Sequence, residues 1–119
     1  MAKKDIRGSK ILFDNGADGE LICFHCQQAI EKYFKGYLIY KTGRLIEGHN
    51  LVKLCKRVML YDQSFCEFIK EMAFVNAFYI ETRYPSIEPL FVSKEDVILC
   101  LDIMGRVVHK IDKLIEIDR

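Results

Sequence analysis

Hydrophobic residues recur along this chain three or four positions apart, which is the spacing of amphipathic helices, and no strand-like alternation persists. The clearest stretch covers residues 20–41 and is followed by Thr42 and Gly43, where a glycine is typical of a helix end. A second long stretch covers residues 94–117. The prolines are confined to one short segment, so the rest of the chain can be nearly continuous helix. The pattern therefore predicts an all-α protein.

Capping signals predict the starts of two helices. Ser64 and Glu67 have the spacing of a capping box and begin a helix that runs to residue 83, because Pro85 disfavours helical geometry just before it. Ser93 and Asp96 form the same signal at the start of the last helix.

Shorter helical stretches cover residues 2–13 and 51–58, and the segment 84–92, with both prolines, is predicted to be a loop. We expect a single domain over residues 1–119. Its expected architecture is an up-and-down helical bundle of four main helices plus a short N-terminal helix.

Composition narrows the class of protein. Half of the 119 residues are hydrophobic and 29% are charged, which is typical of a globular domain and not of a disordered chain. The net charge of +1 argues against a domain dedicated to non-specific nucleic-acid binding, although a local basic groove is compatible with it. No apolar run is long enough to span a membrane, and no signal-peptide pattern follows the basic N-terminus. We therefore expect a cytoplasmic protein without a membrane partner.

The five cysteines include a CxxC pair, Cys23 and Cys26, which raises the question of metal or redox chemistry. No second pair follows to complete four zinc ligands, and the pair lies in a helical stretch. The sequence therefore favours small packing residues at a helix seam, and it predicts no metal site and no cofactor.

The polar residues of the stretch 23–38 are more particular than solubility requires. Glu31 and Lys35 are four apart in the favourable order for an ion pair, and Gln27 and Glu31 share one helical stripe. This stripe can bond to the loop that holds Arg83, either as a buried network or dimer seam, or as part of a ligand site. Lys32 can extend a small basic patch.

Three ordered blocks identify a resemblance. The chain reads CFHCQQAIEKYFKGYL over residues 23–38, then HNL at 49–51, then YIETRYP at 79–85. These blocks resemble the FHxQQAxEKxxKAxL, HDL and tyrosine–RYP patterns of the HEPN domain family, with Asn50 in place of the usual aspartate. The resemblance covers nearly the whole chain.

The resemblance implies a helical bundle, often a homodimer, that is linked to nucleotide binding. Relatives are often encoded beside a minimal nucleotidyltransferase, in pairs that include toxin–antitoxin systems. The implied partners are therefore a second copy, a minimal nucleotidyltransferase and a nucleotide or RNA. The wider superfamily also includes metal-independent RNases that use an Arg-x4–6-His motif across a dimer.

Two arginine–histidine pairs are candidates for that motif. Arg44 and His49 have the correct spacing but lie at the turn between two helices, whereas the family motif lies near the last helices. Arg106 and His109 lie on the last helix but are only three apart, which still places them on one face. Histidine can move protons near neutral pH and arginine can neutralise a phosphate. Whether the chain is an enzyme stays open.

For ligand binding, the resemblance and the helix positions indicate Tyr79, Arg83, Tyr84 and His49, together with Gln27, Glu31 and Lys32 on the first long helix. Each has a structural alternative: a helix cap for His49, and a dipole contact for Arg83 at a helix C-terminus. Three functions follow: a nucleotide- or RNA-binding module, an RNase toxin, or a helical dimer without chemistry.

Overall fold

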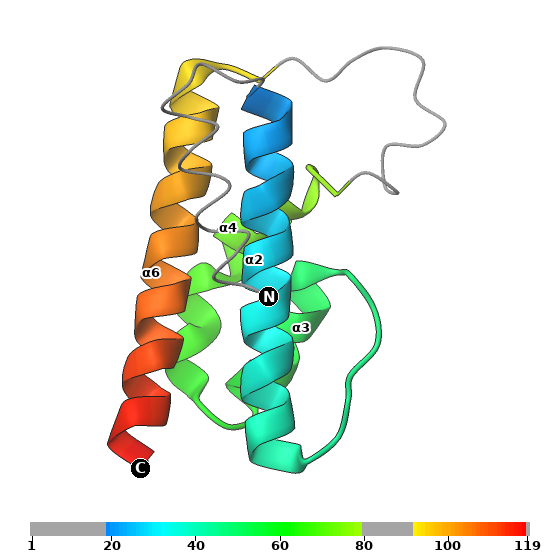
Figure 1. Ribbon diagram of the computed structural model, residues 1–119, viewed down its shortest axis with the longest axis vertical. Coiled ribbons are helices and arrows are strands. Elements are labelled where there is room, and N and C mark those ends of the chain that lie inside the picture. Colours follow the sequence, from blue (N-terminus) through cyan, green and yellow to red (C-terminus); the bar gives the residue numbers. More distant parts are fainter. Residues whose placement is uncertain (1–18, 80–91, 119) are drawn as a thin grey trace.

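The computed structural model describes residues 19–79 and 92–118, and this part of the chain is helical without strands. Figure 1 shows the arrangement. The elements in chain order are α2 (Gly19–Thr42), α3 (Leu51–Met59), the 3-10 helix η1 (Gln63–Phe68), α4 (Ile69–Asn76) and α6 (Lys94–Asp118). The prediction of an all-α helical bundle is confirmed. The helix expected over residues 2–13 and the segment 80–91 lie outside the described residues.

The two long helices, α2 and α6, lie side by side and run in the same direction (Figure 1). Their seam is closed by small side chains, because Cys23, Cys26 and Cys100 are fully buried in the core cluster. The prediction that Cys23 and Cys26 are packing residues at a helix seam is therefore confirmed. Within the described residues, no helix is long and apolar enough to cross a membrane.

Residues 43–50 carry the chain from the end of α2 back to the middle of the same helix (Figure 1). Gly43 ends α2 with a positive φ of 71°, and its amide donates to the Ile39 carbonyl at 2.7 Å. Gly48 has a φ of 108°, a conformation that side chains rarely adopt. The second glycine turns the chain directly before His49, which sets the direction in which that residue meets α2.

Helix α3 begins where the sequence predicts, but its cap is Asn50 and not His49. The Asn50 side chain accepts hydrogen bonds from the amides of Val52 at 3.0 Å and Lys53 at 3.2 Å. The structural alternative in which His49 caps this helix is therefore wrong. Because Asn50 satisfies the free amides, the His49 side chain is available for other contacts.

The fourth helix differs from the prediction in its start and its length. Its first turns are the 3-10 helix η1, and the α-helical part ends at Asn76. Asp62 is the N-cap, because its carboxylate accepts from the Ser64 amide at 3.0 Å, so the expected Ser64 cap is wrong. Phe65 and Phe68 are both buried, and a three-residue repeat brings residues three apart to the same face. Three-residue bonds also close the turn up to Tyr79.

The start of α6 agrees with the sequence. The Ser93 hydroxyl accepts from the Asp96 amide at 3.1 Å, and the Asp96 carboxylate accepts from the Ser93 amide at 3.4 Å. The predicted capping box is therefore confirmed.

Candidate functional site

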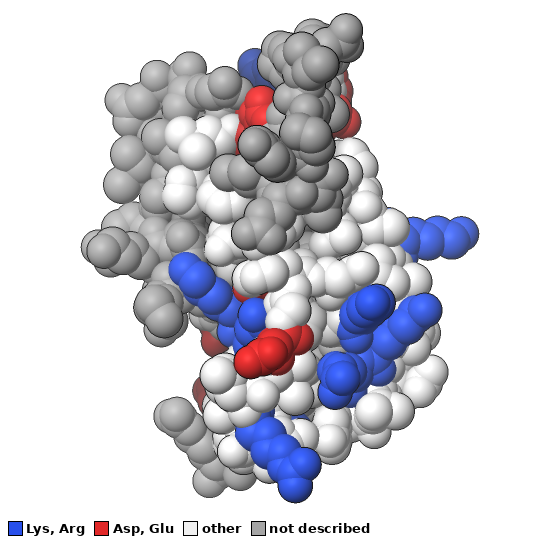
Figure 2. Space-filling model, turned by 90° about the vertical axis from the view of Figure 1, so that its right-hand side faces the viewer, with Lys and Arg blue, Asp and Glu red and all other residues white. Residues whose placement is uncertain are grey.

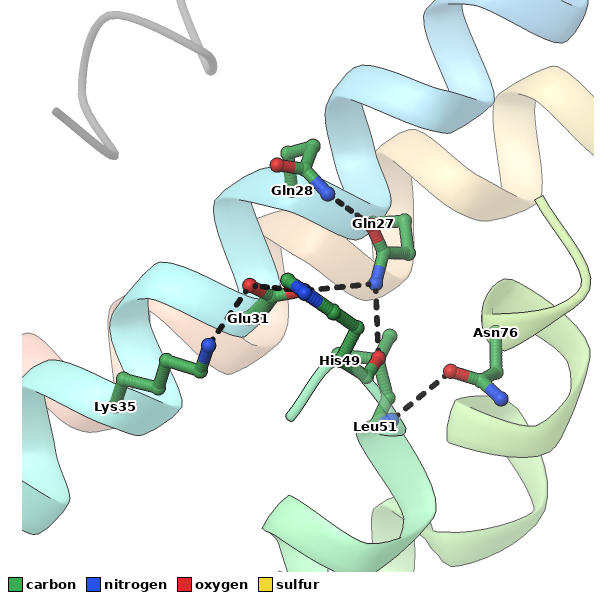
Figure 3. Close-up of polar contacts among 7 residues, drawn as sticks. All are labelled: Gln27, Gln28, Glu31, Lys35, His49, Leu51 and Asn76. Carbon is green, nitrogen blue, oxygen red and sulfur yellow. Dashed lines mark hydrogen bonds and ion pairs between the residues drawn. The ribbon is translucent and has the colours of Figure 1, made fainter. Parts of the chain in front are cut away.

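A buried carboxylate lies at the centre of a polar network in the middle of α2 (Figure 3). Glu31 is only 5% exposed, and a buried charge of this kind is costly unless it is paired. Lys35, one turn further along α2, donates to it at 3.1 Å. The predicted Glu31–Lys35 ion pair is therefore confirmed, and it neutralises part of the buried charge.

The second partner of Glu31 comes from the segment before α3. His49 Nδ1 lies 3.0 Å from both carboxylate oxygens of Glu31. Since a carboxylate can only accept, Nδ1 carries the proton. The His49 ring also stacks on Tyr79, with 4.7 Å between ring centroids and 15° between planes. The imidazole is thus held by Glu31 at Nδ1 and by Tyr79 across one face, while the His49 side chain stays 47% exposed.

Gln27 joins α2 to the backbone of the same segment. It is fully buried, and its Nε2 donates to Glu31 Oε1 at 3.3 Å and to the His49 carbonyl at 3.2 Å. Its Oε1 accepts from Gln28 at 2.7 Å. The shared stripe of Gln27 and Glu31 therefore exists as predicted, and it holds the segment that ends in His49. Arg83, which was expected to meet this stripe, lies outside the described residues.

The end of α4 completes the arrangement. Asn76 Oδ1 accepts from the Leu51 amide at 2.9 Å and so ties α4 to the start of α3 (Figure 3). Tyr79, three residues later, supplies the ring on which His49 stacks. Residues of the first two sequence blocks and Tyr79, the first residue of the third, therefore meet at His49.

The chemistry available at this place follows from the His49 tautomer. With Nδ1–H directed at a carboxylate, the neutral ring keeps its lone pair on Nε2, which can accept a proton. When the ring is doubly protonated, Nε2–H can donate to a phosphate oxygen. A carboxylate behind a histidine also fixes its orientation, as general acid–base groups require.

The other predicted site residues lie in different places. Lys32 is partly buried on α2. Arg44 is exposed at the start of the 43–50 connection, five residues before His49, and its side chain forms no hydrogen bond or ion pair with a described residue. Arg83 and Tyr84 lie outside the described residues.

The second arginine–histidine pair lies on the opposite side of α2, on α6 (Figure 1). Arg106 bonds Glu71 of α4 and, at 2.9 Å, Asp102 of its own helix. Its hydrogen bonds to Glu71, with Asp102 adding, raise the pKa of its guanidinium. The guanidinium also lies 5.7 Å from the Phe68 ring centroid. Arg106 thus joins α6 to α4, while His109 is exposed.

The buried thiols carry no sign of reactive cysteine chemistry. The hydrogen bond with Cys23, together with burial, raises the pKa of Cys100. Burial, with Cys66 nearby, raises the pKa of Cys55 to about 11, and its thiol donates to the Phe65 carbonyl at 3.5 Å. Thiols of this kind stay protonated and unreactive. Among the described residues, no group of three or more His, Cys, Asp or Glu side chains could hold a metal ion.

Sequence reasoning missed the contribution of two asparagines. In the sequence Asn50 only departs from the usual aspartate of the family block. In the structure it caps α3, so His49 does not have to. Asn76 stands at helical spacing among the apolar residues Phe65, Phe68, Ile69 and Met72, and a partly buried asparagine near a helix end commonly bonds a neighbouring backbone group. An asparagine within an apolar stripe was the signal that could have identified it.

Comparison with known proteins agrees with these blocks. The model of the HEPN domain family matches residues 1–114, nearly the whole chain, so this protein belongs to the HEPN domain family. Comparison with curated proteins and with solved structures gives no match. The family and the helical bundle together indicate a helical module related to nucleotides or RNA.

Proposed function

We propose that this protein binds a phosphate of a nucleotide or of RNA beside His49, as the helical partner of a minimal nucleotidyltransferase. The observation that carries the proposal is the fixed and half-exposed His49 ring, with Nδ1 at 3.0 Å from Glu31 and one face on Tyr79. A histidine used only for packing does not need a buried carboxylate to set its tautomer. Nε2, which bonds no described residue and belongs to a side chain that is 47% exposed, is the group that meets the ligand.

The charges around the site support an anionic ligand. Seven of the chain's 18 basic residues, but one of its 17 acidic residues, lie between positions 32 and 57. Glu31, just before this segment, is buried and paired. The segment is therefore strongly basic in a protein that is nearly neutral as a whole.

The test is a titration with ATP and with UMP, followed by NMR of the histidine side chains. We expect shifts at His49 and a loss of affinity of about tenfold or more in His49→Asn, since a charge-assisted bond to phosphate contributes about 1.5–3 kcal/mol. His109→Asn is the matched variant on α6. Loss of binding in that variant alone would move the site to α6, and no binding by the unaltered protein would contradict the proposal.

A homodimer and the nucleotidyltransferase belong to the same proposal. Leu21, Ile98 and Leu99 are between 41% and 50% exposed, and the starts of α2 and α6 are close because Gly19 faces Val97. Exposed apolar side chains on these two helix starts suit a protein interface. Co-expression with a minimal nucleotidyltransferase, followed by size analysis, tests both partners. A monomer that forms no complex would contradict this part.

A metal-independent RNase is the second candidate, because Arg44 has the family spacing from His49 and its side chain forms no hydrogen bond or ion pair with a described residue. In this reading His49 moves the proton of the attacking 2′-hydroxyl and Arg44 neutralises the phosphate. RNA cleavage in EDTA that is lost in both Arg44→Ala and His49→Ala would support it. Absence of cleavage and of growth arrest on expression would exclude it.

A further inference from the structure

The exposed side of α3 carries the densest group of cations in the described part of the protein. Lys53, Lys56 and Arg57 are exposed, whereas the opposite side of the helix, with Leu51, Leu54, Cys55 and Val58, is buried. Figure 2 views the side of the molecule on which α3 lies, and Lys and Arg side chains gather over the lower half of that side, around an acidic side chain. The group is therefore a defined surface and not a scatter of charges.

These cations are not used to hold the fold together. Within residues 19–79 and 92–118, the side chains of Lys53, Lys56 and Arg57 form neither a hydrogen bond nor an ion pair. By contrast, Arg106 bonds two carboxylates and Lys110 lies 3.7 Å from Glu67. Neighbouring cations that form no ion pair raise the local positive potential. They attract an anion that can neutralise several of them at once.

The spacing of these cations suits a chain of phosphates. Positions 53, 56 and 57 fall within little more than one helical turn, about 5–6 Å along the axis. Successive phosphates of an extended single strand have a similar separation. Three cations within little more than one turn can neutralise two adjacent phosphates, and a polyanion gains from each further cation that it meets through counterion release.

Exposed apolar and aromatic side chains continue this surface past the end of α3. Leu60 is 79% and Tyr61 47% exposed, directly after the helix. A base of an unpaired strand can stack on an exposed tyrosine, whereas the bases of a duplex are already stacked on one another. The combination favours a single strand over a duplex.

We infer that the exposed side of α3, with Lys53, Lys56, Arg57 and Tyr61, binds the backbone of single-stranded RNA and leads it to the His49 site. The inference rests on the proposed function at His49 and names its substrate as a strand of several nucleotides. The site and the surface are continuous in the chain, since His49 stands directly before the Asn50 cap of α3.

The experiment measures binding of fluorescein-labelled 2′-O-methyl U20, which cannot be cleaved through its 2′-oxygen, at several salt concentrations. The variant K53Q/K56Q/R57Q removes three positive charges from α3. The matched control K70Q/K94Q/K113Q removes three exposed positive charges elsewhere, each close in sequence to acidic residues. We expect the α3 variant to lose at least tenfold in affinity at low salt and to reduce the slope of log K against log salt by about 2. We expect Tyr61→Ala to weaken binding of this strand and not of a 20-base-pair duplex.

The outcomes separate this inference from the proposed function. If U20 binds no more tightly than UMP while His49→Asn still abolishes UMP binding, the inference fails and the proposed function stands. If neither ligand binds, both fail. Equal affinity and salt slope in the two triple variants would overturn the inference. It would also be overturned if the α3 variant kept its RNA affinity but lost the nucleotidyltransferase, because the surface would then bind a protein.

Discussion

His49 and Glu31 are eighteen positions apart, and the imidazole Nδ1 lies 3.0 Å from both oxygens of a carboxylate that is only 5% exposed. The pair joins the connection before α3 to the middle of α2. It stabilises the fold, and within the described residues it leaves Nε2 of the ring without a hydrogen-bond partner. Structure and proposed chemistry therefore depend on the same contact.

Substitutions of Glu31 separate its contribution to stability from its contribution to ligand binding. Glu31→Ala leaves Gln27, Lys35 and His49 without their common partner, and we expect a loss of about 2–3 kcal/mol in the free energy of unfolding. Glu31→Gln keeps an acceptor and should lose less, about 1 kcal/mol, while its nucleotide affinity still falls. Urea unfolding measures both changes. Glu116→Ala, at an exposed position of α6, is the control, and an equal loss there would contradict the argument.

The sequence predicts the long helices well because their apolar periodicity and end signals agree. For α6, both the Ser93–Asp96 capping box and the bounds match to within a residue at each end. The 3-10 geometry of η1 was not predictable in this way. The 3-10 geometry depends on the N-cap being Asp62, two residues before the predicted Ser64. It also depends on the burial of the Phe65 and Phe68 rings, which tertiary packing determines.

The candidate site was predictable as a set of residues but not as a geometry. The motif blocks identify Gln27, Glu31, His49 and Tyr79, and the structure brings all four together. Helical spacing links Gln27 to Glu31, but no local rule places a residue eighteen positions away on the same carboxylate. That contact depends on the path of the 43–50 connection, and so on the positive φ of Gly48.

Gly48 therefore offers a backbone test of the site. Gly48→Ala adds a Cβ that meets nothing within 4 Å. The loss in the free energy of unfolding therefore comes only from placing alanine at a φ of 108°. We expect about 1–2 kcal/mol lower stability and weaker nucleotide binding.

Gly36→Ala should have the opposite effect on stability, because Gly36 lies within α2 with open space around it and an ordinary φ. We expect it to raise stability by about 0.5–1 kcal/mol, and a loss there would indicate that a partner covers this face.

Tyr79 tests the stacking contribution. Tyr79→Leu removes the ring that lies 4.7 Å from the His49 centroid, so the imidazole gains freedom and nucleotide affinity should fall about three- to tenfold. Tyr79→Phe keeps the ring and should keep more of the affinity. Isothermal titration with UMP distinguishes the two, and equal affinities would show that stacking does not position His49.

Arg106 decides between the two arginine–histidine pairs. If it only joins α6 to α4, Arg106→Ala lowers the free energy of unfolding by about 1–2 kcal/mol, a modest value because its side chain is 43% exposed. The folded variant should bind nucleotide and RNA normally. Lys113→Ala is the matched α6 control. Normal stability with lost binding would instead support Arg106 and His109 as the functional pair.

The raised pKa of Cys55 predicts a loss of stability in alkaline solution. Burial raises this pKa from 9.0 to about 11, with Cys66 contributing, so the folded state favours the protonated thiol. That contribution is complete below pH 9 and is lost as pH rises through 11, because only the unfolded chain then releases the proton easily. Between pH 8.5 and 10.5 the thiol accounts for about 1–2 kcal/mol of lost stability.

Cys55→Ala should therefore show a smaller decline over this interval than the unaltered protein, although its stability at pH 7 is lower because the packing at this site is lost. Cys66→Ala, at an exposed position, should keep most of the decline. Chemical unfolding at a series of pH values measures the slopes. A slope in Cys55→Ala equal to that of the unaltered protein would show that another group, such as Tyr33 or Cys100, whose pKa values are also raised, causes the alkaline loss.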